Sequence, residues 1–371
     1  MPGQTGRGRK ETTAVSLEEM VRKVWNEERG ADPTGVLRIV LSLLSLPYRG
    51  AVAARNRFYD QSILRQERLP CPVISVGNLT VGGTGKTPAV ILIAQMLKEK
   101  GRRPAVLSRG YGGTARAPVN IISDGRQILM GWKESGDEPI LIAKAVPEVP
   151  VLTGPERVRI GHAAIERYGA DALVLDDAFQ HRALFRDLDI VMLDAARPLG
   201  NGFLLPRGPL REPQEALRRA HLLIRTGDPE SDRPLPGVPP LPSFHGIHRP
   251  RELVEAATGR ALPIAELSGK KVCAFAGIGN PETFRRSLLE LGAEVAAFRA
   301  FPDHHPYRTS DLDALRRLSA KNAADRIVTT EKDGIRLADF PDFLKELSLL
   351  RIGMAITPAD AFAELLFSRV R

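Results

Sequence analysis

The stretch VGNLTVGGTGKTPAV, residues 76–90, has the pattern of a phosphate-binding loop. Such a loop follows a strand, surrounds phosphate oxygens with backbone N–H groups and leads into a helix whose positive end faces the phosphates. Lys86 can reach the outer phosphates of a nucleotide, and the hydroxyl of Thr87 can hold Mg²⁺. The pattern therefore predicts a nucleotide site made of Thr80, Val81, Gly82, Gly83, Thr84, Gly85, Lys86 and Thr87.

The residues on either side of the loop fit the same interpretation. VISVG, residues 73–77, is typical of a buried strand, and PAVILIAQMLKEKG, residues 88–101, predicts a helix closed by a glycine. Only Thr80 departs from the pattern GxxxxGK[ST], because a glycine normally stands there. A glycine-rich turn without a ligand is the alternative, and the strand–loop–helix context favours the phosphate loop.

A second pattern, ALVLDDAFQHR at residues 172–182, predicts a buried parallel strand that ends in two carboxylates. Asp176 and Asp177 would then lie at the carboxyl edge of the sheet, where they can hold Mg²⁺ beside the loop. Strands often end in aspartate, so this pattern is weak alone. It gains weight because the phosphate loop precedes it in the same segment of alternating strands and helices.

Two loops carry candidate acid–base residues. In SGDEP, residues 135–139, Asp137 can accept a proton from an attacking hydroxyl if it lies near a γ-phosphate, although a helix N-cap or surface acid is the simpler interpretation. In FPDHHPY, residues 301–307, His304 and His305 can form a base relay or bind a metal. The spacing is poor for zinc, and a solvated loop is an equal alternative.

Arginines stand in two loops that glycine and proline delimit. They lie in SRGYGG, residues 108–113, and in LPRGPLRE, residues 205–212. Arginine binds phosphate with a planar, bidentate group, so these loops are candidate phosphate clamps. The candidates are Arg109, Arg207 and Arg211.

The composition describes a globular chain with a basic balance. A length of 371 residues exceeds one ordinary core and predicts two domains. The formal charge of +9 favours anionic partners, although a solvated basic surface explains it as well. Cys71 and Cys273 lie far apart, which predicts a reducing compartment with no disulfide framework and no zinc site.

An apolar segment, TGVLRIVLSLLSLPYRGAVAARNRFYD at residues 34–60, predicts a helix in the membrane interface. Its apolar run, residues 36–46, is shorter than the ~20 residues needed to span a bilayer. We expect Pro47 to break this run. A helix buried on the main domain is the alternative. The arginines that can lie near lipid phosphates are Arg49, Arg55 and Arg57.

Strands that alternate with helices predict a P-loop NTPase-like α/β fold, in which helices flank a parallel sheet. A proline-rich connection, followed by a second alternation, predicts a smaller second α/β domain. The expected order is a disordered or peripheral extension at 1–33, the interface helix at 34–60, the P-loop domain at 61–240, a linker at 241–266, the smaller α/β domain at 267–356, and a C-terminal helix at 357–371 that can pack back on the P-loop domain.

A set of motifs in a fixed order resembles the tetraacyldisaccharide 4′-kinase family. The resemblance covers roughly residues 36–355, and the ordered set is specific although several members are weak alone. The family's loop also lacks the first glycine, which accounts for Thr80. The motifs are SVGNLTVGGTGKTP, SRGYGG, GDEP, LDDAFQHR, LPRGPLRE, AGIGNPETF, FPDHHPY and TTEKD.

The resemblance implies a lipid kinase at a membrane surface. Such an enzyme uses ATP and Mg²⁺ to phosphorylate the 4′-hydroxyl of tetraacyldisaccharide 1-phosphate, which forms lipid IVA in lipid A biosynthesis. It lies on the cytoplasmic face of the inner membrane of a Gram-negative bacterium, as a monotopic or peripheral protein. Because an acylated substrate must be reached at the bilayer, the resemblance also favours the interface interpretation of residues 34–60.

The resemblance also implies roles for individual residues. Asp137 matches the family's proposed catalytic base, and His304 would pair with it in preference to His305. The implied metal site consists of Thr87, Asp176 and Asp177, and the implied phosphate or substrate contacts are Arg109 and Arg211.

Two other functions fit parts of the sequence. A P-loop switch or assembly ATPase that acts on a protein partner explains the loop and the paired aspartates equally well, but leaves Asp137, His304 and the apolar segment without a role. A nucleic-acid-binding protein is suggested by charge alone. Ala178 stands where the resembled family commonly has glycine, and residues 1–30 have no counterpart in it.

Overall fold

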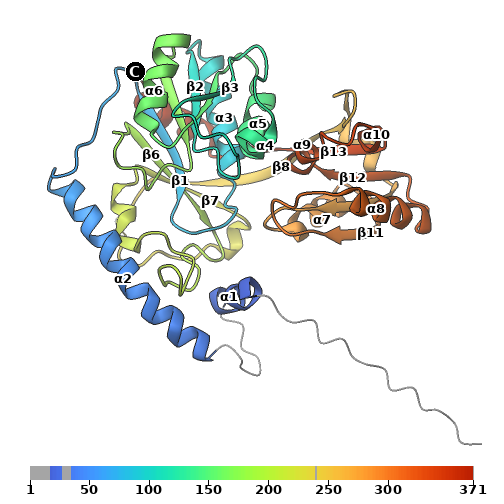
Figure 1. The fold of residues 1–371 in the computed structure, drawn as a ribbon, viewed down its shortest axis with the longest axis horizontal. Helices are drawn as coiled ribbons and strands as arrows, with labels where there is room; N and C mark the ends of the chain where they lie inside the picture. Colours follow the sequence, from blue (N-terminus) through green and yellow to red (C-terminus); the bar gives the residue numbers. More distant parts are fainter. Residues whose placement is uncertain (1–16, 27–34, 239, 371) are drawn as a thin grey trace, which may run out of the picture.

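A mixed β-sheet runs through the computed structural model, which describes residues 17–26, 35–238 and 240–370 (Figure 1). The sheet has 13 strands in the order β11-β10-β12-β13-β8-β7-β6-β1-β5-β2-β4-β3, with β9 paired to β8. The predicted α/β fold with flanking helices is confirmed. The sheet is not parallel throughout, because β3 runs antiparallel to β4, and β8 runs antiparallel to both β13 and β9.

The first half of the sheet surrounds β1 and contains the phosphate-loop motif. Its central strands are buried along their whole length, as expected for a parallel sheet covered on both faces. The strands are β1 (Val73–Asn78), β2 (Pro104–Ser108), β3 (Asn120–Ser123), β4 (Val151–Thr153), β5 (Ala172–Asp176), β6 (Leu188–Asp194) and β7 (Leu222–Thr226). The helices are α3 (Lys86–Glu99), α4 (Trp132–Ser135), α5 (Asp137–Ala145), α6 (Arg157–Tyr168), η1 (Gln214–Arg219) and η2 (Pro229–Ser231).

The second half continues the same sheet and forms the orange and red part of Figure 1. Its strands are β8 (Ser243–Glu255), β9 (Ala261–Leu262), β10 (Lys271–Ala276), β11 (Glu294–Ala300), β12 (Arg326–Thr330) and β13 (Leu347–Thr357). Its helices are η3 (Ile264–Leu267), α7 (Pro281–Glu290), α8 (Thr309–Lys321), α9 (Glu331–Arg336), α10 (Pro341–Leu344) and α11 (Ala359–Ser368).

The prediction of a linker at residues 241–266 is wrong for most of that range. Residues 243–255 form β8, which pairs with β13 from Ser348↔Glu255 to Thr357↔His245 and so joins the two halves. The strand includes Pro250, although proline removes a hydrogen bond from a strand. It is tolerated because it lies opposite Ile352, where the register shifts at a bulge.

Helix α2 (Gly35–Asp60) is continuous, so the predicted break at Pro47 is wrong. The missing proline N–H costs one hydrogen bond, but the alanine-rich turns after it favour helix. Its 26 residues are long and apolar enough to cross a membrane by length and composition, which corrects the expectation of a run too short to span. Leu41 alone is buried among the helix's described residues, which contradicts the buried-helix alternative.

Residues 17–26 of the predicted extension form a second N-terminal helix, α1 (Leu17–Asn26). The remainder of that predicted extension, residues 1–16 and 27–33, lies outside the described residues. Figure 1 shows α1 near one end of α2, beneath the loops that follow β6. The N-terminal part is therefore at least partly folded against the main body.

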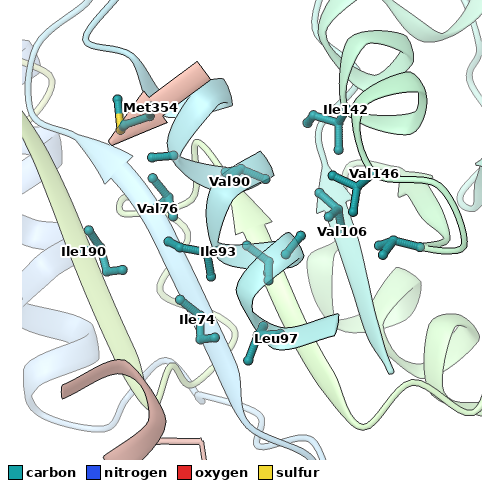
Figure 2. Packing of buried hydrophobic residues seen from close by; sticks show 14 of the residues in the cluster. Ile74, Val76, Val90, Ile93, Leu97, Val106, Ile142, Val146, Ile190 and Met354 are labelled. Carbon is teal, nitrogen blue, oxygen red and sulfur yellow. The ribbon is translucent and has the colours of Figure 1, made fainter. Parts of the chain in front are cut away.

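The largest apolar cluster holds the phosphate loop's strand and helix together. Figure 2 shows Ile74 and Val76 of β1 against Val90, Ile93 and Leu97 of α3. The same cluster includes Met354 of β13 and two residues of α11, Phe362 and Leu366, so the end of the chain packs on the first half. This shared core fixes the start of α3 relative to the edge of the sheet. It also ties β13 to the first half.

Candidate active site

The phosphate-loop motif forms a turn between β1 and α3, as its strand–loop–helix pattern predicts. Gly85 precedes the helix with a φ of 80°, and Gly82 has a φ of 130°. Residues other than glycine rarely adopt these backbone angles. A Cβ added at Gly85 would also lie 2.6 Å from His248 Nε2, so the loop is closely packed under β8. The first N–H groups of a helix have no partner within the helix, so those at the start of α3 can bind an anion.

Asp177 lies between two cations at the mouth of this loop. Arg211 Nη1 donates to both oxygens of Asp177, at 2.9 and 2.8 Å, and Lys86 Nζ lies 3.7 Å from Asp177 Oδ1. Burial alone would raise the pKa of Asp177, but the charges of Lys86 and Arg211 outweigh it and hold this pKa below its ordinary value. Asp177 is thus an anion that orients the two cations nearest the phosphate site.

Asp176 is the better candidate for a metal ligand. It is buried at the end of β5, in register with Val76 of β1, and its Oδ1 has no hydrogen-bond partner among the described residues. Burial, with the negative charges of Glu138 and Asp177, raises the pKa of Asp176 well above its usual range. A buried carboxylate oxygen with no partner is a position that a bound cation would stabilise.

The residues at this position fit Mg²⁺ more than a metal caged by protein. In the described part of the chain, no three His, Cys, Asp or Glu side chains group as a metal site. Mg²⁺ is commonly held by one or two carboxylates together with substrate phosphates and water, so a caged site is not required. Thr87 lies in the first turn of α3, next to the loop. Thr87 and Asp176 are therefore a suitable donor set.

Asp137 and His304 meet although they come from opposite halves of the sheet. Asp137 begins α5 and is buried, and its Oδ2 lies 3.0 Å from His304 Nδ1. His304 follows β11 and has a φ of 57°, a left-handed conformation that is uncommon for residues other than glycine. Its backbone N–H donates to Asp303 Oδ1 at 3.0 Å, which supports that turn.

The two pKa values of this pair shift in opposite directions. Burial alone would raise the pKa of Asp137, but the hydrogen bond from His304 and the charges of Lys332 and Arg336 hold it below its ordinary value. The hydrogen bond with Asp137 raises the pKa of His304, despite burial and the charge of Lys332. The arrangement therefore favours an ionised carboxylate that is ready to accept a proton.

His305 is directed elsewhere. Its Nε2 lies 3.0 Å from Asp311 Oδ2, and its ring stacks on Phe301 with centroids 4.7 Å apart. The two neighbouring histidines therefore have different surroundings: His304 faces Asp137, and His305 packs within the second half.

The structure brings together Asp137 with His304, and Lys86 with Asp177 and Arg211. Arg109 is exposed just after β2, and Arg207 lies over the Phe203 ring at 4.5 Å.

Three further cations surround the site, and no role was predicted for them from the sequence. Lys332 Nζ lies 3.2 Å from Glu138 Oε1 and 3.3 Å from His304 Nε2. Arg336 is buried, with its Nε 3.6 Å from Asp137 Oδ2. Both belong to α9, which begins within the TTEKD motif at residues 329–333. Lys332 is the lysine of that motif, so the motif was the available signal. No pattern marked Arg157, which is buried near Asp176.

Glu138 connects the two parts of the site. It follows Asp137 in α5, its negative charge helps to raise the pKa of Asp176 after the larger effect of burial, and it pairs with Lys332. The carboxylates beside the phosphate loop and the Asp137–His304 pair therefore belong to one contiguous polar site. The site lies where α5 of the first half meets α9 of the second half.

The site combines a phosphate loop, a buried carboxylate on the strand that neighbours β1 in the sheet, and an acid–histidine pair. This combination defines the class of protein: a P-loop phosphotransferase. A family model described as tetraacyldisaccharide-1-P 4′-kinase matches residues 37–371. The chain belongs to this family.

Individual proteins agree with this assignment. A tetraacyldisaccharide 4′-kinase of Syntrophus aciditrophicus is 49% identical, over 96% of this chain and 100% of its own length. One from Anaeromyxobacter sp. strain Fw109-5 is 47% identical, over 86% of this chain and 88% of its own. A crystal structure of "apo" form LpxK from Aquifex aeolicus in complex with ATP superposes with a TM-score of 0.76 at 33% identity, covering 90% of this chain and 100% of that one. The predicted family and ATP-dependent kinase function are confirmed, and the switch-ATPase alternative is not favoured.

Proposed function

We propose that this kinase phosphorylates the 4′-hydroxyl of tetraacyldisaccharide 1-phosphate with Asp137 as its general base. The observation that carries the proposal is the contact of 3.0 Å between His304 Nδ1 and Asp137 Oδ2 in a site shared with the phosphate loop. A carboxylate held ionised by a histidine and nearby cations can take the proton of an attacking hydroxyl.

The reaction has one transfer step. The 4′-hydroxyl gives its proton to Asp137 as its oxygen forms a bond to the γ-phosphorus of ATP. The bond between the γ-phosphorus and the oxygen that bridges it to the β-phosphorus breaks, and ADP leaves. His304 stays on Asp137 Oδ2 and orients the other oxygen toward the acceptor.

The chain's cations and amides stabilise the charge in this step. Lys86 and the N–H groups at the start of α3 bind the phosphate oxygens, and Arg211 approaches them beside Asp177. Thr87 and Asp176, with Asp177 nearby, would hold Mg²⁺, which when bound neutralises charge on the β- and γ-phosphate oxygens. Lys332 adds a positive charge on the acceptor side of the site.

Helix α2 brings the acylated acceptor to the site. Its exposed apolar side chains, which include Leu43 at 61% and Leu46 at 61% exposure, suit the acyl region of a bilayer. Its other face is attached to the main body, because Tyr48 donates to Arg211 O at 2.9 Å. We place this helix on the cytoplasmic face of the inner membrane, where ATP is available.

The direct test is transfer of labelled γ-phosphate from Mg-ATP to tetraacyldisaccharide 1-phosphate in mixed detergent micelles. The wild-type chain should give labelled bis-phosphorylated lipid, and Lys86→Ala should give none. Asp137→Asn should bind ATP normally but transfer about 10²- to 10⁴-fold more slowly. Asp342→Asn, an exposed acid of α10, is the matched control and should be fully active.

Each contrary result has a defined meaning. A fully active Asp137→Asn variant would exclude Asp137 as the base while leaving the kinase reaction intact. Hydrolysis of ATP by the folded wild-type chain with no labelled lipid would exclude the lipid acceptor and restore the switch ATPase.

A further inference from the structure

Helix α1 precedes the residues that the family's model matches, yet it packs on a loop of the active site. The family's model begins at residue 37, and α1 ends at Asn26. Trp25 Nε1 donates to Pro206 O at 3.0 Å, and Asn201 Nδ2 donates to Val24 O at 3.3 Å. Val24 is fully buried. The helix is therefore held by both polar and apolar contacts.

The loop that α1 contacts runs between β6 and η1, at residues 195–213, and has no regular secondary structure. Such a loop keeps one conformation only if contacts along its length offset the cost of ordering it. Its internal bonds include Leu205 N to Leu210 O at 2.9 Å and Gly208 N to Leu204 O at 3.0 Å. Ser45 of α2 accepts a hydrogen bond from Arg207 N at 3.1 Å.

The far end of the same loop reaches the phosphate site. Val81 N donates to Pro209 O at 2.8 Å, and Arg211 N donates to Leu79 O at 2.7 Å, so the loop lies alongside the start of the phosphate loop. The Arg211 guanidinium then bonds both oxygens of Asp177. Pro206, the partner of Trp25, belongs to the same short segment as Arg211.

We propose that Trp25 is a positioning residue: through its bond to Pro206, α1 holds the 195–213 loop so that Arg211 meets Asp177 beside the phosphate loop. The proposal rests on the role of Arg211 near the transferred phosphate, which is part of the proposed function. Trp25 itself contacts neither substrate. The N-terminal helix then stabilises the conformation of the loop that carries Arg211 into the kinase site.

The test is a double-mutant cycle on the full-length chain, measured as transfer of labelled phosphate to the lipid acceptor. Trp25→Phe keeps one aromatic ring and removes the N–H donor together with the second ring of the indole. We expect it to lower kcat/KM about fivefold, the effect of one lost hydrogen bond, and to lower the thermal midpoint by only about 1 to 2 °C in a chain of this size. In an Arg211→Lys background, Trp25→Phe should have no further effect, because the two residues act through one contact. A structural role unrelated to Arg211 would give the same loss in both backgrounds.

Leu17→Ala is the matched control, because Leu17 lies on the same helix and is 65% exposed. It should leave kcat/KM unchanged. In hydrogen exchange, Leu205 N–H and Gly208 N–H should lose protection in Trp25→Phe but not in Leu17→Ala. Full activity of Trp25→Phe, or equal losses in the wild-type and Arg211→Lys backgrounds, would overturn the proposal. Wild-type and Arg211→Lys activities are measured in the same series, so failure of the kinase assignment is seen separately.

Discussion

At the scale of single residues, the character of Asp137 depends on its neighbours. Burial opposes its ionisation, while the hydrogen bond from His304 and two cations favour it, and the favourable interactions prevail. These two pKa shifts make the stability of the fold depend on pH. Because the pKa of Asp137 is lowered, its contribution to stability is present above pH ~3.9 and is lost as the pH falls through its folded-state pKa. Because the pKa of His304 is raised, its contribution to stability is complete below pH ~6.5 and is lost as the pH rises through its folded-state pKa.

His304→Ala should therefore shift the pH dependence of the reaction. It removes the hydrogen bond that is the strongest of the interactions lowering the pKa of Asp137 and leaves burial in place. That pKa should rise, so the acidic limb of the pH profile of kcat/KM should move to higher pH. His162→Ala, an exposed histidine paired with Glu67, is the control and should not move it. An unmoved acidic limb in His304→Ala would show that Asp137 is not the titrating base.

Lys332 offers a second test at this scale. Lys332→Met removes the cation that pairs with Glu138 and lies beside His304. Two effects follow: the pKa of Asp137 rises, and positive charge near the transferred phosphate is lost. We expect kcat to fall about 10²-fold or more, the range for losing one group that stabilises developing charge. Lys345→Met, which removes an exposed ion pair with Asp342, should be neutral in the same steady-state assay.

The sequence predicted these residues unevenly, for physical reasons. Lys86 and Asp176 could be placed because a strand–loop–helix pattern and a strand end fix their positions locally. Asp137 and His304 are far apart in sequence, so their pairing came only from the family resemblance. The TTEKD motif contains Lys332, but no role was predicted for this lysine, because its partner Glu138 lies far away in sequence, in the other half.

At the scale of elements, α2 shows how a local rule can mislead. Proline usually ends a helix, but here Pro47 is accommodated within a helix of 26 residues. Strand β8 shows the same for a sheet, because it follows a proline-rich stretch that suggested a linker, and its own Pro250 lies at a bulge. The local sequence signals neither feature. The continuation of the helix depends on the surroundings of α2, and the bulge depends on the neighbouring strand β13. The strands β1 and β5 were predictable because continuous apolar runs decide them.

The exposed apolar face of α2 predicts membrane binding that can be weakened without unfolding. Replacing Leu43 and Leu46 with asparagine should lower binding to anionic phospholipid vesicles about tenfold or more, because each leucine loses its favourable transfer into the bilayer interface. Leu289→Asn, an exposed leucine of α7 in the other half, is the control. Co-sedimentation with vesicles measures the effect. Equal binding by the double variant and the control would exclude this face of α2 as the membrane contact.

At the scale of the whole molecule, one sheet and one core link the two halves. Strands β8 and β13 pair over most of their length, and the cluster around β1 and α3 includes Met354 and Ile356 of β13. Asp137 and His304 then meet across the halves. If a flexible linker joined the second half, Asp137 and His304 would meet only when the two halves happened to come together. The shared sheet instead holds the two halves in a fixed position relative to each other.

This architecture predicts a single cooperative unfolding transition that ATP shifts as a whole. ATP at about 100 times its Kd should stabilise the fold by about 2.7 kcal/mol and raise the thermal midpoint by roughly 3 °C in a chain of this size. Asp137→Asn should keep this shift, since it removes the base and leaves the phosphate loop intact, whereas Lys86→Ala should lose most of it. Differential scanning calorimetry with and without Mg-ATP measures both quantities. Two separate transitions, with only one moved by ATP, would mean that the halves fold independently and that the sheet does not couple them.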